Sequence, residues 1–311
     1  MTRTVAVTGG TGFVGAAVIE ALLARGDSVK ALARNPEKLP QRNQVACVAG
    51  SLESDEALAR LAAGADALIH CAALTRARRD EEYFLANVEG ARRAAAVSAK
   101  GGAKFVHVSS MAARQPDLSP YAASKRQSEE AVAEACRGSS WIALRAPAIY
   151  GPGDQMTLPY FKLVRSGVAL EPLSSPAPRA SILYVADAAA AILAALDGEL
   201  AGGVYEVADD RAEGYSWREI GETLGEVLNV RPRRMRLPRA IIGGYHGLSR
   251  GVAMAMGRVP EVRRGQANEF FHPDWVARDN LLNRATGWRP ATPLKEGFAK
   301  TVRWYQENGL L

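Results

Sequence analysis

The sequence predicts an α/β protein with a doubly wound parallel sheet and a smaller, interleaved C-terminal region. Two observations support this prediction. Short apolar segments alternate with helix-length amphipathic segments through the first half of the chain, and a glycine-rich turn directly follows the first apolar segment. Such alternation is typical of βαβ units, and a glycine turn between a first strand and a first helix is typical of the Rossmann fold.

The strand predictions rest on short runs rich in β-branched and apolar residues, and the helix predictions rest on apolar residues or alanines recurring at three- and four-residue spacing. In chain order, we expect strands at 4–7, 28–33, 44–49, 67–70, 104–108, 141–144, 182–185 and 204–207. Helices are expected between them at 12–25, 55–63, 81–100, 120–136 and 187–196.

The regular alternation weakens near residue 150, where prolines crowd the chain up to about residue 180. It returns briefly, and after residue 209 the sequence turns basic and is expected to be rich in loops. We therefore predict a Rossmann domain formed by residues 1–150 with 180–208. Residues 151–179 with 209–311 are expected to form the substrate-binding region. Met254 and Met256, in the second region, are expected to be core residues rather than part of an adaptable lid.

Composition excludes several classes of protein. The chain has 311 residues, of which 48% are hydrophobic and 23% charged, which excludes a disordered chain or an elongated coiled coil. The net charge of +6 is interpreted as a mildly basic surface, with no nucleic acid as partner. Three scattered cysteines indicate reduced thiols, no structural metal site and a cytoplasmic location. No signal peptide is expected, because a glycine cluster soon interrupts the apolar run at the N-terminus. No membrane span is expected either, because the apolar segment 237–257 carries Arg239, His246 and Arg250.

The glycine turn is the first sign of a binding site. Gly9, Gly12 and Gly15 follow the first predicted strand and open the first predicted helix. Gly9 permits a tight turn, Gly12 lets the backbone approach a pyrophosphate, and Gly15 lets the helix pack on the sheet. The amide groups at the helix N-terminus would then bind the phosphates of a dinucleotide.

The end of the second predicted strand indicates which dinucleotide is bound. NAD-binding folds place a carboxylate about 20 residues after the glycines, to bind the ribose 2′-hydroxyl. This chain has Arg34 at that place, with Lys30 and Lys38 nearby and no acidic residue from 28 to 36. A guanidinium can bind a 2′-phosphate with paired hydrogen bonds, so the sequence favours NADP as the cofactor.

A third motif carries acid–base chemistry. Tyr121 and Lys125 are four residues apart on a predicted helix and share one face. A cation beside a phenol favours the phenolate and suits it to exchange a proton with an alcohol or a carbonyl group near neutral pH. Ser110 ends the preceding strand and would project from the carboxyl end of the sheet, where such folds bind ligands. Its neighbour Ser109 is an alternative to it.

These motifs, in this order, resemble the extended branch of the short-chain dehydrogenase/reductase family, which includes NAD(P)-dependent epimerases and dehydratases. Further matches extend the resemblance over nearly the whole chain: His70-Cys-Ala-Ala73, Asn87-Val-Glu-Gly90, Leu144-Arg-Ala-Pro-Ala-Ile-Tyr-Gly-Pro152, Tyr184-Val-Ala-Asp187 and Gly287-Trp-Arg-Pro290.

The resemblance implies a role for each matching residue. Tyr121 would be the catalytic acid and base, Lys125 would tune it and bind the nicotinamide ribose, and Ser110 would polarise the substrate carbonyl. Asn87 would support the helix on the cofactor side. The remaining cofactor contacts would come from Gly9, Thr11, Gly12, Phe13, Val14, Gly15, Ala72, Ala73, Pro147 and Ile149. Family members are often dimers, so a homodimer is also implied.

Two departures from the family pattern bear on function. Ser51 stands where an acid usually contacts adenine, and Ala148 stands where sugar-nucleotide enzymes commonly have an asparagine. We therefore predict an NADP(H)-dependent oxidoreductase acting on a carbonyl or secondary alcohol of a small, rather apolar substrate. The alternatives are a nucleotide-sugar epimerase or dehydratase with a tightly held cofactor, and a noncatalytic NADPH-binding assembly subunit.

Overall fold

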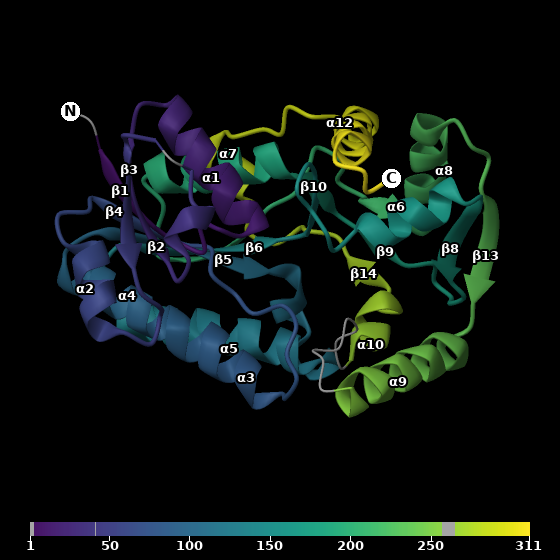
Figure 1. Ribbon diagram of the computed structural model, residues 1–311, viewed down its shortest axis with the longest axis horizontal. Helices are drawn as coiled ribbons and strands as arrows, with labels where there is room; N and C mark the ends of the chain where they lie inside the picture. The colour runs from purple at the N-terminus through teal and green to yellow at the C-terminus, as the bar shows by residue number, and fades with distance from the viewer. Residues whose placement is uncertain (1–2, 41, 257–264) are drawn as a thin grey trace.

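A single parallel sheet forms the centre of the molecule (Figure 1). The computed structural model describes residues 3–40, 42–256 and 265–311. All neighbouring strands of the seven-stranded sheet run parallel, in the order β11-β6-β5-β4-β1-β2-β3. This confirms the predicted doubly wound fold. The strands are β1 (Thr4–Thr8), β2 (Ser28–Ala33), β3 (Val45–Ala49), β4 (Ala67–His70), β5 (Lys104–Ser110), β6 (Trp141–Ala146) and β11 (Gly203–Glu206).

Helices cover both faces of this sheet. On one face α1 (Phe13–Ala24) and α7 (Val185–Asp197) pack over the strands, and their alanine, valine, isoleucine and leucine side chains form one fully buried cluster. On the other face α2 (Asp55–Ala62), α4 (Gly90–Lys100) and α5 (Pro120–Ala135) build a second cluster around Leu61 and Phe105. The central strands β1, β4, β5 and β6 are buried on both faces and are therefore mostly apolar rather than alternating, whereas the edge strand β3 is mostly exposed.

The helix expected at 81–100 is continuous but not uniform. It begins as α3 (Glu81–Tyr83), passes through the π-helical turn η2 (Phe84–Glu89) and continues as α4. A π-helical turn holds one more residue than an α-helical turn and is frequent at functional sites. Asn87 lies inside this turn and is buried.

The second region packs beside the carboxyl ends of the strands. The short strand pair β7 (Ala148–Tyr150) and β10 (Ile182–Tyr184) leads into a third apolar cluster around Phe161, Phe298 and Tyr305. The other strands are β8 (Val168–Pro172), which pairs with β13 (Arg233–Leu237), and β12 (Tyr215–Ser216), β9 (Arg179–Ala180) and β14 (Asp274–Trp275), which form a three-stranded sheet.

The expectation of a loop-rich chain after residue 209 is wrong. This part contains α8 (Trp217–Leu228), α9 (Arg239–Ala255), α10 (Gln266–Phe270), α11 (Leu282–Thr286) and α12 (Leu294–Glu307), in addition to α6 (Leu158–Arg165) earlier in the same region. The helix signal was present in the sequence: Ser216 and Glu219 form a capping box at the start of α8. The domain boundaries expected above remain a prediction.

The helix α9 departs from expectation in its exposure. Met256, directly after its C-terminal end, is 58% exposed, so the interpretation of this methionine as a core residue is wrong, whereas the side chain of Met254 lies outside the described residues. In the described ranges, no helix combines the length and the apolar character that crossing a bilayer requires.

Candidate active site

A cavity of about 460 Å³ opens at the carboxyl ends of β1, β2, β3 and β4. This is the edge at which doubly wound sheets bind ligands. Five of the predicted cofactor residues line the cavity together, although they come from three separate segments of the chain: Gly9, Thr11, Arg34, Ala72 and Ala73.

The glycine turn has no space for side chains. Gly9 has a φ of +73°, and a Cβ atom on it would lie 2.6 Å from the Ala72 nitrogen. A Cβ atom on Gly15 would lie 2.1 Å from the Gly9 carbonyl oxygen, which also accepts a hydrogen bond of 2.9 Å from the Gly12 amide. Glycines are therefore required both for the turn and for its contact with α1, and the bare backbone fits a pyrophosphate at the N-terminus of α1.

Not every predicted cofactor residue reaches the cavity. Val14 packs against the core under α1, and Phe13 packs against the cluster of the second region. Pro147 is buried, and Ile149 in β7 packs into the core. Of the lining residues, the sequence analysis missed Glu53, Glu89 and Arg93, which the turn after β3 and the π-turn with α4 bring to the far side of the cavity.

Two guanidinium groups, those of Arg34 and Arg93, line the cavity. Arg34 is exposed directly after β2, and within the described residues no carboxylate lies within ion-pair distance of it. Arg93 donates a hydrogen bond of 2.7 Å to the Glu53 carbonyl oxygen and is 3.5 Å from Asp55. Lys30 does not join them, because its ammonium group donates to the Arg60 and Ala63 carbonyl oxygens at the end of α2, each at 2.7 Å.

The predicted catalytic residues meet where α5 starts beside the end of β5. Ser119 caps α5 by accepting a hydrogen bond from the Ala122 amide at 3.0 Å, and Pro120 occupies the first turn, so Tyr121 lies at the very start of the helix. One turn later, Lys125 donates to the Val108 carbonyl oxygen at 2.9 Å. This bond ties α5 to β5 two residues before Ser110.

Burial makes Lys125 an unusual lysine. Its side chain is 1% exposed, and burial lowers its pKa to about 8, against the opposing effect of the negative charge of Glu129. A buried ammonium group close to its pKa at neutral pH is suited to holding a nearby phenol in the charged form. The ring of Tyr121 also packs edge-to-face on Tyr83, with 6.1 Å between the ring centroids.

The two serines at the end of β5 have different surroundings. Ser109 is buried and donates a hydrogen bond of 2.6 Å to Glu129, which also accepts from two guanidinium nitrogens of Arg145, Nε at 3.0 Å and Nη2 at 2.7 Å. Ser110 is only half-buried, and its hydroxyl oxygen accepts from the Ala112 amide at 3.2 Å. Ser110 keeps its hydroxyl hydrogen for another partner, so it is the better candidate for contact with a substrate oxygen.

Two histidines form a neutral wall behind this site. His70 and His107 are fully buried, and burial followed by the charge of Lys125 lowers the pKa of His70 to about 3 and places that of His107 well below its usual value. His70 shares a hydrogen bond of 2.8 Å with Thr8, and His107 one of 3.0 Å with Ser128. Both histidines belong to the core of the protein.

Asn87 holds the segment after β4 against α5. Its amide oxygen accepts from the Leu74 amide at 2.6 Å, and its nitrogen donates to the Leu74 carbonyl oxygen at 3.0 Å and to Ser124 at 2.9 Å. Asn87 therefore positions the wall of the cavity that carries Ala72 and Ala73, and it supports the cofactor side without lining the cavity.

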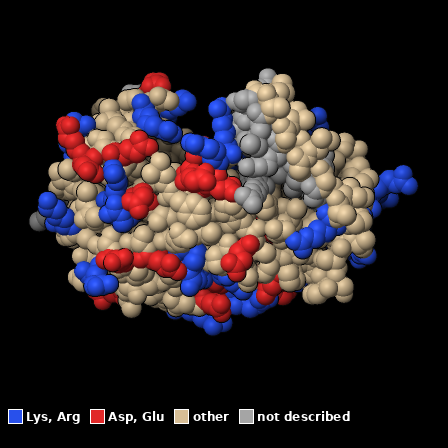
Figure 2. Space-filling model, turned by 90° about the horizontal axis from the view of Figure 1, so that it is seen from below, with Lys and Arg blue, Asp and Glu red and all other residues tan. Residues whose placement is uncertain are grey.

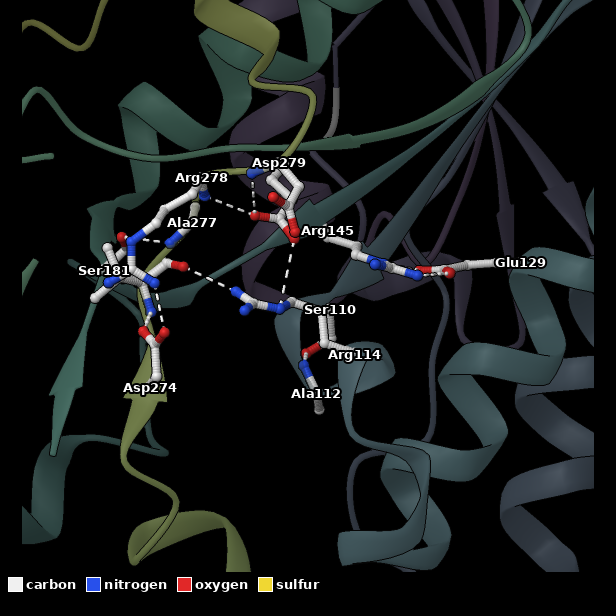
Figure 3. A network of polar contacts seen from close by, with 12 residues as sticks. Ser110, Ala112, Arg114, Glu129, Arg145, Ser181, Asp274, Ala277, Arg278 and Asp279 are labelled. Atoms are coloured by element: carbon white, nitrogen blue, oxygen red, sulfur yellow. Dashed lines mark hydrogen bonds and ion pairs between the residues drawn. The ribbon is translucent and has the colours of Figure 1, made fainter. Parts of the chain in front are cut away.

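A second network, which the sequence analysis missed, ties the C-terminal region to the site. Glu206, 2% exposed, accepts from the backbone amides of Arg278 and Asp279 at 2.8 and 3.0 Å and lies 3.7 Å from Arg114. Arg114 also donates to the Val276 carbonyl oxygen at 2.8 Å. Figure 3 shows Arg114 reaching from the Ser110 side of the network toward this segment. The turn that follows Ser110 is thus fixed by residues from the end of the chain.

Comparison with known proteins places these features in context. Residues 5–208 match the model of the NAD dependent epimerase/dehydratase family. Over 317 aligned residues, covering 99% of this chain and 96% of the relative, the chain is 39% identical to the ceramide reductase of Caulobacter vibrioides. Two solved structures, gox2253 (TM-score 0.79, 21% identity, all of both chains) and a UDP-glucose 4-epimerase from Thermotoga maritima bound to UDP-glucose (TM-score 0.76, 19% identity, 98% and 99% of the chains), share the fold.

Proposed function

We propose that this chain, which belongs to the NAD-dependent epimerase/dehydratase family, is a reductase of the extended short-chain type that uses NADPH to reduce the ketone group of an apolar, lipid-like substrate. The observation that carries this proposal is the buried Lys125, held by the Val108 carbonyl oxygen one helical turn after Tyr121 and beside Ser110. In this proposal residues 1–150 with 180–208 bind the cofactor, and residues 151–179 with 209–311 bind the substrate.

The chain's own residues divide the chemistry between them. When bound, NADPH supplies the hydride that reaches the carbonyl carbon. The hydroxyl group of Ser110 donates a hydrogen bond to the carbonyl oxygen, and the phenol of Tyr121 gives the proton that this oxygen takes up. Lys125 stabilises the resulting phenolate through its positive charge. Burial of Lys125 excludes water and so strengthens the electrostatic attraction between the two groups.

The preference for NADPH rests on the charges at the adenosine end of the cavity. Arg34 and Arg93 both border it, and Arg34 has no carboxylate partner among the described residues. We expect NADPH to bind at least tenfold tighter than NADH, or about 1.4 kcal/mol. Titration of both cofactors by fluorescence tests this, and Arg34→Asp should erase or reverse the preference. Equal affinities in the unmodified protein would refute it.

The choice of substrate class is supported from two sides. One relative that matches over nearly its whole length is a ceramide reductase, which suggests a ketone on a long-chain lipid. Ala148 is exposed on β7 and offers no side-chain donor for the diphosphate of a sugar nucleotide. We therefore expect NADPH oxidation with long-chain or cyclic ketones, and no thermal stabilisation of the NADP-loaded protein by UDP- or GDP-sugars at millimolar concentration.

Opposite results would favour the alternatives. Stabilisation by a sugar nucleotide without turnover of any ketone would support an epimerase or dehydratase. Neither response would support a noncatalytic NADPH-binding subunit.

Replacement of the proton donor tests the chemistry directly. Tyr121→Phe keeps the ring and its packing on Tyr83 but removes the hydroxyl group, so turnover should fall by about 100-fold or more while NADPH affinity stays nearly unchanged. Full activity of this variant would show that the protein is not a reductase of this kind.

A further inference from the structure

The helix α9 exposes an apolar surface that the proposed chemistry does not use. Among its described side chains none is buried, and Ile241, Leu248 and Val252 are 56%, 71% and 51% exposed. Met256, directly after the helix, is 58% exposed. Large apolar side chains on a protein surface are usually scattered, and a contiguous group of them marks an interaction site.

These side chains lie along one side of the helix. At about 100° per residue, Ile241, Leu248, Val252 and Met256 fall within a sector of roughly 80°, which is one continuous stripe. Glycines and alanines fill the adjoining sector: Ala240, Gly244, Gly247, Gly251 and Ala255. A helix on the surface of a protein in water normally turns charged residues outward. The uncharged region at the upper right of Figure 2 lies over α9.

The sequence that contains this stripe carries charge of one sign. In the sequence no acidic residue occurs between Glu226 and Glu261, whereas seven arginines do. Two of them, Arg231 and Arg233, are exposed where the chain enters β13, and neither pairs with a carboxylate in the described part of the chain. The neighbouring Arg234 and Arg236 bind Glu171. The length of the strand β13 separates Arg231 and Arg233 from the start of α9. An apolar helix in a stretch of sequence whose charges are all positive matches the surface of a membrane with anionic lipids, where headgroups bind the cations and the acyl boundary accepts the apolar side chains.

The same helix is connected to the catalytic residues. Arg239 at the start of α9 donates a hydrogen bond to Asn268 of α10, and Asn268 donates to the Leu118 carbonyl oxygen at 3.1 Å. Ser119, the cap of α5, donates to Glu269 of α10. Tyr121 follows two residues later. A surface bound to α9 would therefore lie close to the end of the helix that carries the predicted proton donor.

We propose that α9 is an interfacial helix that docks the protein on an anionic membrane surface and brings the site to a substrate that stays in the bilayer. The delivery of substrate rests on the proposed function, whereas the membrane contact does not. Ile241, Leu248, Val252 and Met256 enter the boundary between headgroups and acyl chains, while Arg231 and Arg233 bind lipid phosphates.

The test measures binding to vesicles with the full chain and needs no turnover. Vesicles of phosphatidylcholine with about one-third phosphatidylglycerol should cosediment the protein, and pure phosphatidylcholine vesicles should bind it much less. Leu248→Glu with Val252→Glu should reduce binding about tenfold or more, because each of these side chains gains at least that factor on burial. Arg231→Ser with Arg233→Ser should reduce it about fivefold per arginine.

A matched variant controls for the added negative charge. Ala59→Glu with Gln306→Glu places two glutamates at exposed positions on α2 and α12, away from α9, and should bind vesicles like the unmodified protein. On a short, water-soluble ketone all variants should keep the unmodified rate, and only the α9 and arginine variants should lose activity on a ketone embedded in vesicles.

Three outcomes would overturn the proposal: no binding of the unmodified protein to anionic vesicles, unchanged binding of the α9 double variant, or a dimer in solution that the same double variant dissociates. The last result would identify a second copy of the chain as the occupant of this face. Vesicle binding without ketone reduction would instead refute the proposed function and leave the membrane contact standing.

Discussion

The buried Lys125 makes a prediction about stability that can be worked out from its pKa. The folded protein lowers this pKa from 10.5 to about 8, chiefly through burial. Each pKa unit corresponds to about 1.36 kcal/mol, so the charged form costs the folded state about 3 kcal/mol. Between pH 8 and 10.5 the unfolded chain binds more protons at this position than the folded one, and the free energy of unfolding therefore rises with pH in this window.

The variant Lys125→Met isolates this contribution. It removes the ionisable group, so the unmodified protein should gain stability relative to the variant as pH rises, by about 2 kcal/mol from pH 7 to pH 9.5. Urea unfolding of both proteins at the two pH values, without cofactor, measures the change in their difference. Buried tyrosines also change the stability at high pH: burial raises the pKa of Tyr215, so its contribution to the free energy of unfolding falls as pH rises. This contribution is the same in both proteins and cancels in the difference between them.

Lys295→Met makes the same exchange at an exposed position on α12 and controls for the loss of a lysine. The reasoning would be refuted by a stability difference between Lys125→Met and the unmodified protein that stays constant from pH 7 to 9.5.

Three further changes probe the frame around the site. Glu129→Gln leaves the largely buried Arg145 without its carboxylate, so the free energy of unfolding should fall by about 3 kcal/mol. Because the charge of Glu129 raises the pKa of Lys125, the same variant should move the alkaline limb of the kcat/KM profile to lower pH, and an unmoved limb would contradict this. Gly15→Ala should abolish NADPH binding in fluorescence titration because of the contact with the Gly9 carbonyl oxygen, whereas Gly203→Ala, where a Cβ atom meets nothing within 4 Å, should not. Ser216→Ala should cost about 1 kcal/mol in urea unfolding by removing the cap of α8, and Ser216→Thr should recover most of it.

Local patterns predicted the cofactor half of the molecule well. The apolar strands and the glycine turn are each encoded within a few residues, and the observed bounds of β2 and β4 equal the expected ones. The choice between Ser109 and Ser110 could not be made from the sequence, because alternation along a strand places the two on opposite faces without indicating which face meets Glu129. That choice needs the packing of α5.

The parts that were missed depend on contacts between distant segments. Arg93 on α4 lines the same cavity as Arg34, which is far from it in the sequence. Glu206 binds residues that follow it by more than 70 positions. No short window of sequence contains both partners of such a contact. The pairing of β8 with β13 is another example. In the sequence Arg234 and Arg236 indicate only a basic segment, whereas in the structure both form ion pairs with Glu171 of β8.

The wide turn η2 has a consequence for the whole segment from residue 81 to 100. The buried side chains Tyr83, Asn87, Ala91 and Ala95 follow each other in steps of four, and each such step overshoots a turn of 3.6 residues by about 40°. In a uniform α-helix the first and last of them would point about 120° apart. The extra residue of the π-helical turn η2 compensates for much of this angle. The continuous helix 81–100 therefore faces Tyr121 with its first turn and the sheet with its last turn. Loss of a single residue here would turn Tyr83 and Asn87 away from α5 and leave α4 in place, which makes the length of this turn as important to the site as the identity of any side chain in it.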